Sequence, residues 1–92
     1  MTVLEQFRLN GRRALVTGGG RGLGRVIAQA FAEAGADVAV AGRTPDVCQE
    51  AAREIGAATG RRALAFAGDV TQAAEVERLV REVEDGLGGI DI

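Results

Sequence analysis

A glycine-rich segment near the N-terminus limits the possible folds of this chain more than any other feature. Residues 16–24 read VTGGGRGLG. They begin at the end of the apolar run of residues 14–16, and that run is typical of a buried β-strand. After the glycines, apolar residues recur at spacings of three and four, which predicts one apolar face of a helix. These residues are Leu23, Val26, Ile27, Ala30, Phe31 and Ala34. The sequence therefore predicts a strand, a tight glycine-rich turn and a helix in direct succession.

This turn has the properties of a phosphate-binding site. The N-terminus of a helix offers backbone N–H groups without intrahelical acceptors, and the helix dipole is positive there. Glycines let the backbone approach a ligand closely, because no Cβ atom stands in the way. We therefore predict that residues 17–24 bind the phosphates of a nucleotide.

The spacing of the glycines narrows the kind of nucleotide site. The common dinucleotide pattern is Gly-x-Gly-x-x-Gly. Started from Gly18, its last position falls on Leu23. Started from Gly20, it falls on Arg25, so neither start fits. A P-loop needs lysine and then a hydroxyl residue after its last glycine, but Arg25 and Val26 stand there, which argues against an NTPase.

Strand and helix patterns alternate along the rest of the chain. The strand patterns are at residues 13–17, 37–41 and 62–67. The helix patterns are at residues 22–34, 45–55 and 72–87, and the last is expected to end at Gly86, Gly88 and Gly89. Thr44 and Thr71 are in position to cap the second and third helices. The alternation predicts a parallel sheet with helices on both faces, joined by right-handed crossovers.

The glycine spacing that fits is Thr-Gly-x-x-x-Gly-x-Gly, and with it the chain resembles the short-chain dehydrogenase/reductase family. The fixed positions of this pattern are Thr17, Gly18, Gly22 and Gly24. Residues 42–43 and 68–70 extend the resemblance, which covers essentially the whole chain. It implies an α/β fold, a Rossmann-type doubly wound parallel sheet, of which this chain is the N-terminal part with about three strands and three helices. The family's strand order is three-two-one-four, so residues 90–92 would begin a fourth strand. The alternative reading is an ordinary flexible glycine loop.

Composition excludes several other kinds of protein. The chain has 92 residues, enough for one domain, and a net charge of −2, which argues against a nucleic-acid-binding surface. It has one cysteine and no histidine, so an internal disulfide, a histidine-based triad and a histidine-ligated zinc site are excluded. The apolar runs are too short to span a membrane. Residues 1–6 show no secretory signal pattern, so we expect a cytoplasmic protein.

The residues after the second predicted strand favour one nicotinamide cofactor. Ligands of doubly wound sheets lie beyond the carboxyl ends of the strands, and an NAD site usually has a carboxylate after the second strand. Here Gly42 and Arg43 stand at that place, and Asp37 lies at the wrong end of the strand. A guanidinium suits a 2′-phosphate, and Arg21 would add a second positive charge. We therefore expect NADP(H) rather than NAD(H); the alternative for Arg43 is a solvated loop residue.

The resemblance also implies a role for the end of the third strand. Asp69 would accept a hydrogen bond from the adenine amine and Val70 would pack near the ring, whereas the alternative is that Asp69 caps a helix or lies in a turn. The expected cofactor-binding residues are Thr17, Gly18, Gly20, Arg21, Gly22, Leu23, Gly24, Arg43, Thr44, Asp69 and Val70. We expect no metal-binding residue, and we read Cys48 as part of a buried helix stripe.

No catalytic residue can be identified in this chain. Members of the family continue into a fourth strand ending in Asn-Asn-Ala-Gly, and later supply a serine and a Tyr-x-x-x-Lys pair. This chain contains no tyrosine and no lysine, so residues 1–92 are expected to form a cofactor-binding domain truncated before the catalytic segment. The resemblance implies the N-terminal part of an NADP(H)-dependent oxidoreductase that acts on an alcohol or ketone and is usually a homo-oligomer. The alternative is a non-catalytic dinucleotide-binding module or a truncated gene product.

Overall fold

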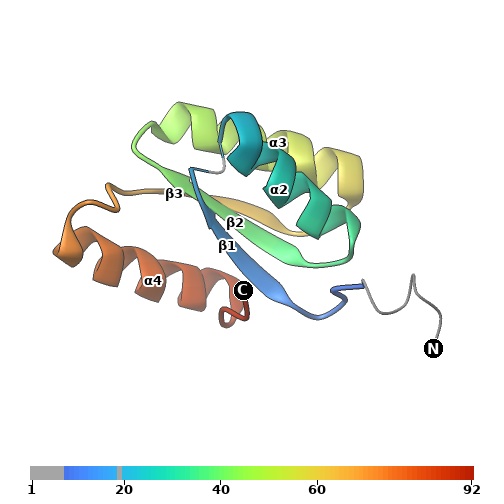
Figure 1. The fold of residues 1–92 in the computed structure, drawn as a ribbon. Coiled ribbons are helices and arrows are strands. Elements are labelled where there is room, and N and C mark those ends of the chain that lie inside the picture. The colour runs from blue at the N-terminus through green and yellow to red at the C-terminus, as the bar shows by residue number, and fades with distance from the viewer. Residues whose placement is uncertain (1–7, 19) are drawn as a thin grey trace.

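Three parallel strands, with helices on both faces, make up the computed structural model, which describes residues 8–18 and 20–92 (Figure 1). The elements in chain order are β1 (Arg13–Thr17), α2 (Gly22–Glu33), β2 (Asp37–Gly42), α3 (Pro45–Thr59), β3 (Ala63–Ala67) and α4 (Ala73–Leu87). The strand order is β1-β2-β3, so the expected alternation and parallel sheet are confirmed. Residues 1–6, which suggested the absence of a signal sequence, lie outside the described residues.

The central strand β2 is buried on both faces of the sheet. Because successive strand residues point to opposite faces, Val38 and Val40 join a core cluster beneath α2 and α3. Ala39 and Ala41 join a second cluster that contains Leu79 of α4. Figure 1 shows the same arrangement, with α2 and α3 on one face and α4 on the other. The site therefore rests on a strand whose residues 38–41 are fully enclosed.

Helix α2 packs against the sheet mainly through residues outside the predicted apolar face. Its buried residues are Ala28 and Ala32, whereas Leu23, Val26 and Ile27 are 75%, 64% and 38% exposed. The helix carries two apolar stripes, and the one formed by small alanines lies against the sheet. The predicted helix is confirmed, and Phe31 of the predicted apolar face packs against the core, but the larger residues at the start of that face are exposed. The larger residues form an apolar surface that other described residues leave open to solvent.

Two predicted helix boundaries differ in detail. Thr44 is the N-cap residue of α3 but makes no side-chain capping hydrogen bond. The N-cap of α4 is Gln72 rather than Thr71, and the Thr71 hydroxyl donates to Asp69 in the turn before the helix.

Gly86 does not end α4 but lies inside it. A Cβ atom at Gly86 would be 3.1 Å from Leu64 Cδ1 and 3.2 Å from a ring carbon of Phe66, so the glycine lets α4 approach β3 closely. The helix ends at Leu87 and is capped by Gly88, whose φ of +87° is the left-handed conformation common at helix ends.

The last residues of the chain return to the free side of β1. The Asp91 N–H donates to the Arg13 carbonyl at 2.7 Å, and the Leu15 N–H donates to the Ile92 carbonyl at 3.1 Å. The Arg13 guanidinium also forms an ion pair with the Asp91 carboxylate at 3.2 Å. Since β2 occupies the other side of β1, residues 91–92 lie where the family's strand order of three-two-one-four places a fourth strand.

Candidate functional site

The carboxyl ends of the three strands are held side by side by backbone hydrogen bonds. The Gly18 N–H donates to the Ala41 carbonyl at 2.7 Å, which joins the start of the glycine-rich turn to β2. The Gly68 N–H donates to the Gly42 carbonyl at 2.9 Å, which joins the segment after β3 to the same strand. The three segments that the sequence singled out as strand ends therefore meet at one edge of the sheet, where ligands of such sheets bind.

The glycine-rich turn leads into the first turn of α2 without a side-chain cap. Arg21 is the N-cap residue, and the first backbone hydrogen bond of the helix runs from the Arg25 N–H to the Arg21 carbonyl at 3.3 Å. The preceding helical N–H groups, those of residues 22–24, have no acceptor within the helix. No acidic residue stands in this first turn. The arrangement therefore favours an anion at the start of α2.

Two glycines of this turn have backbone conformations that other residues rarely adopt. Gly18 has a φ of +69° and Gly22 a φ of +54°, and a Cβ atom at either would meet no described atom within 4 Å. The space above both residues is thus open. Thr17 ends β1 beside them, Leu23 is exposed at the start of α2, and Gly24 is half-buried in the first helical turn.

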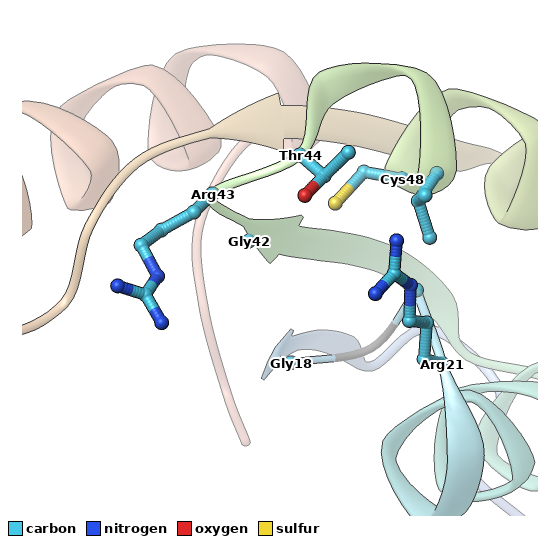
Figure 2. Close-up of a pocket in the computed structure, with 8 residues that line it drawn as sticks. Gly18, Arg21, Gly42, Arg43, Thr44 and Cys48 are labelled. Carbon is cyan, nitrogen blue, oxygen red and sulfur yellow. The ribbon is translucent and has the colours of Figure 1, made fainter.

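A first cleft lies between this turn and the start of α3 (Figure 2). Its volume is about 160 Å³, which is small beside the 300–1,000 Å³ typical of complete ligand pockets. The residues that line it are Gly18, Gly20, Arg21, Gly42, Arg43, Thr44, Val47 and Cys48. Two arginines and no carboxylate are among them, so the cleft suits one anionic group of a larger ligand.

The two arginines approach this first cleft from different sides. Figure 2 shows the Arg21 guanidinium pointing from the glycine-rich turn toward Cys48, while Arg43 extends away on the far side of Gly42. Their electrostatic effects agree with this view. The Arg21 charge acts on the Cys48 thiol, and the Arg43 charge acts on the Asp69 carboxylate.

A second cleft of about 190 Å³ adjoins the first on the β3 side. It is lined by Gly18, Ala41, Gly42, Arg43, Gly68, Asp69, Val70 and Thr71. Gly18, Gly42 and Arg43 line both clefts, so Arg43 stands at their boundary. Val70 is 49% exposed and presents an apolar side chain there. The two clefts together offer a cationic hollow beside a second hollow with apolar and acidic groups.

Asp69 is held in a turn by Thr71. Its Oδ1 atom accepts hydrogen bonds from the Thr71 hydroxyl at 2.6 Å and from the Thr71 N–H at 3.0 Å. These bonds, with a smaller contribution from the Arg43 charge, lower the pKa of the Asp69 carboxyl below its usual 3.8. The carboxylate therefore remains ionised and able to accept a further hydrogen bond at neutral pH.

Replacing Thr71 with valine is expected to raise the pKa of Asp69 toward 3.8, because the hydroxyl donor is lost while the backbone donor remains. A carboxyl whose folded pKa is depressed stabilises the fold above its unfolded pKa, and this stabilisation disappears as the pH falls through the folded pKa. The variant should thus lose less stability as the pH falls from about 4 through the folded pKa. An NMR titration of the Asp69 carboxyl carbon measures the shift; an unchanged pKa would show that the hydroxyl bond contributes nothing.

Sequence reasoning missed four residues that lie at these strand ends or line the clefts there. Val47 and Cys48 were read only as helix-stripe residues, yet they also line the first cleft. Glu75 accepts a hydrogen bond from the Asp69 N–H at 3.1 Å, and Arg78 donates to the Ala67 carbonyl at 3.0 Å. Their positions in the first two turns of α3 and α4 were the available signal, because those turns follow the strand ends directly.

The described residues hold no group of three or more histidine, cysteine, aspartate or glutamate side chains that could bind a metal ion. Within the same part of the chain, no helix combines the length and apolar character needed to cross a membrane.

Comparisons with known proteins agree on one family. The family model described as short chain dehydrogenase matches residues 12–92. A sorbitol dehydrogenase of Cereibacter sphaeroides is 47% identical over 86 residues, which are 94% of this chain and 32% of that protein. The crystal structure of a short-chain type dehydrogenase/reductase from Mycobacterium marinum is 48% identical and has a TM-score of 0.93, covering 99% of this chain and 36% of that one.

A third similar protein carries a cofactor in its name. The NADPH-dependent 3-quinuclidinone reductase of Rhodotorula rubra is 32% identical with a TM-score of 0.92, covering 98% of this chain and 34% of that one. The present chain therefore spans about a third of the length of the relatives and solved structures that it matches.

Proposed function

Because this chain belongs to the short-chain dehydrogenase/reductase family, we propose that it is the cofactor-binding N-terminal part of an NADP(H)-dependent oxidoreductase acting on an alcohol or ketone. Residues 1–92 would form a single cofactor-binding domain, and the catalytic segment would be supplied by sequence that this chain does not contain. The family binds nicotinamide dinucleotides. The choice of NADP(H) and the substrate class are the parts proposed here.

One observation carries the choice of NADP(H): the first cleft is lined by Arg21 and Arg43 and by no carboxylate. In an NAD site, a carboxylate at the end of β2 accepts hydrogen bonds from the adenosine ribose. Gly42 occupies that end of the strand here. A 2′-phosphate would gain two cationic partners and meet no repelling acid. The NADPH dependence named for the Rhodotorula rubra reductase supports the same choice.

The remaining expected residues fit the other parts of the dinucleotide. Gly18 and Gly22 leave open space beside the N–H groups of α2, which suits the pyrophosphate. Asp69 and Val70 line the second cleft and would meet the adenine ring, with Arg43 between ring and 2′-phosphate. Thr44 lines the first cleft near the ribose end. When bound, the cofactor would donate a hydride to a ketone or accept one from an alcohol, and these residues would bind and orient it.

The Arg43→Ala variant tests this proposal. We expect it to weaken NADP+ binding by about 10- to 100-fold, because a charge-assisted contact is worth about 1.5–3 kcal/mol, while NAD+ binding changes little. Titration of both cofactors by calorimetry measures the preference. Arg53→Ala is the matched control, since Arg53 is an exposed α3 residue paired with Glu50 and does not line either cleft. An unchanged preference in Arg43→Ala would remove Arg43 from the cofactor site.

A further inference from the structure

Position 42 is occupied by glycine, although the backbone conformation there does not require one. Gly42 is absent from the glycines with positive φ, so its backbone would accept any residue. It ends β2 on the same face as Val38 and Val40, toward α3 and the first cleft. A side chain at this position would therefore extend into that cleft.

The Cys48 sulfur occupies the space beside Gly42. A Cβ atom at Gly42 would be 3.2 Å from Cys48 Sγ, a tight contact that the sulfur could relieve only by shifting a few tenths of an ångström. Cys48 is 2% exposed and packs in the core cluster with Val40 and Ala51. Burial raises the pKa of its thiol above the usual 9.0, against an opposing effect of Arg21. The group beside Gly42 is thus a neutral, enclosed sulfur.

The helical turn that carries Cys48 is also confined on its other side. Its backbone begins with the hydrogen bond from the Cys48 N–H to the Thr44 carbonyl, at 3.2 Å. A Cβ atom at Gly20 would lie 2.9 Å from Val47 Cγ1 and 3.4 Å from the Cys48 nitrogen. The first turn of α3 therefore packs closely against the glycine-rich turn as well as against β2. It has little freedom to shift away from a side chain at position 42.

We propose that Cys48 is a specificity-determining residue, because its sulfur crowds position 42 and so disfavours the carboxylate side chain that an NAD site usually has there. The inference rests on the proposed function and deepens it. Arg21 and Arg43 attract the 2′-phosphate, and Cys48 keeps the floor of the first cleft free for it. Cys48 acts through Gly42 and need not touch the cofactor itself.

The steric part of this inference is tested without any cofactor. In the protein at its natural length, Gly42→Ala should lower the midpoint of thermal unfolding by about 2–8 °C. In a Cys48→Ala background the same substitution should cost little, since the sulfur is gone. Equal shifts in the two backgrounds would overturn the proposed contact.

The specificity part is tested with NADP+ and NAD+ as probes on the parent, Gly42→Asp, Cys48→Ala and the double variant. Gly42→Asp alone should lose NADP+ affinity and gain little for NAD+. Replacing Cys48 by alanine should then tighten NAD+ binding at least about fivefold more in the Gly42→Asp background than in the parent background. A smaller difference overturns the specificity role.

Failure of the proposed function has a different signature. If the parent binds NAD+ as tightly as NADP+, the choice of NADP(H) is wrong and the specificity role falls with it. The unfolding experiment still decides whether Cys48 crowds a side chain at position 42, because it depends on the fold alone.

Discussion

The 92-residue chain on its own is expected to transfer no hydride between NADP(H) and an alcohol or ketone. Reduction of a ketone leaves an oxyanion that needs a proton, and oxidation of an alcohol needs a base to remove one. Positioned general acid–base groups contribute roughly 10²- to 10⁴-fold to such steps. The family's proton donor is a tyrosine assisted by a lysine, and this chain contains neither residue. The expected loss is therefore that of the whole proton-transfer machinery.

The measurement is cofactor absorbance over a panel of alcohols and ketones, with a full-length relative such as the sorbitol dehydrogenase of Cereibacter sphaeroides as the positive control. A contaminating enzyme would give turnover that persists when the chain's own cofactor residues are changed. Turnover that exceeds the cofactor-only background and disappears in Arg43→Ala would contradict the prediction. Such a result would mean that another group in this chain moves the proton.

The order of elements could be predicted from the sequence because strands and helices have different apolar periods. The three strands were expected at residues 13–17, 37–41 and 62–67, and they lie at Arg13–Thr17, Asp37–Gly42 and Ala63–Ala67. Each is a short apolar run bounded by glycine or charged residues, so neighbouring signals agree. The parallel pairing follows from the alternation with helices, and the structure confirms it.

The face through which a helix packs could not be predicted from periodicity alone. Helix α2 has an apolar stripe at Leu23, Val26 and Ile27 and another at Ala28 and Ala32, and only the second is buried. Burial depends on what lies opposite, which a local pattern does not contain. The N-cap of α4 was missed for a similar reason: the helix begins after Gln72, and the Thr71 hydroxyl donates to the Asp69 carboxylate in the preceding turn.

The backbone segments of the candidate site could be predicted from the sequence, but the side-chain contacts that line its clefts could not. Strand ends locate the turn, Arg43 and Asp69 at one edge of the sheet, as parallel topology requires. The approach of Cys48 to Gly42 depends on how α3 packs against β2, so spacing along the chain does not reveal it. The same holds for Glu75, which is six residues from Asp69 in sequence and reaches its backbone through the fold.

Replacing Gly22 with valine is expected to abolish measurable binding of NADP+. The Cβ atom would enter the open space beside the first N–H groups of α2, where the pyrophosphate is proposed to bind. Losing two charge-assisted N–H contacts, each worth about 1.5–3 kcal/mol, corresponds to at least about a hundredfold loss of affinity. Part of the effect would come from the backbone, since a φ of +54° strains valine by about 1–2 kcal/mol.

Gly60→Val separates these two contributions. Gly60 has a φ of +70° and open space around its Cβ position, but it ends α3 before β3, at the opposite end of the sheet from the turn. Both variants should therefore lose a similar amount of stability in thermal unfolding, and only Gly22→Val should lose NADP+. Equal binding losses in the two variants would mean that Gly22 serves the fold alone. In that case the open space above the turn would have no part in holding a phosphate, and the proposed pyrophosphate position would have to be abandoned.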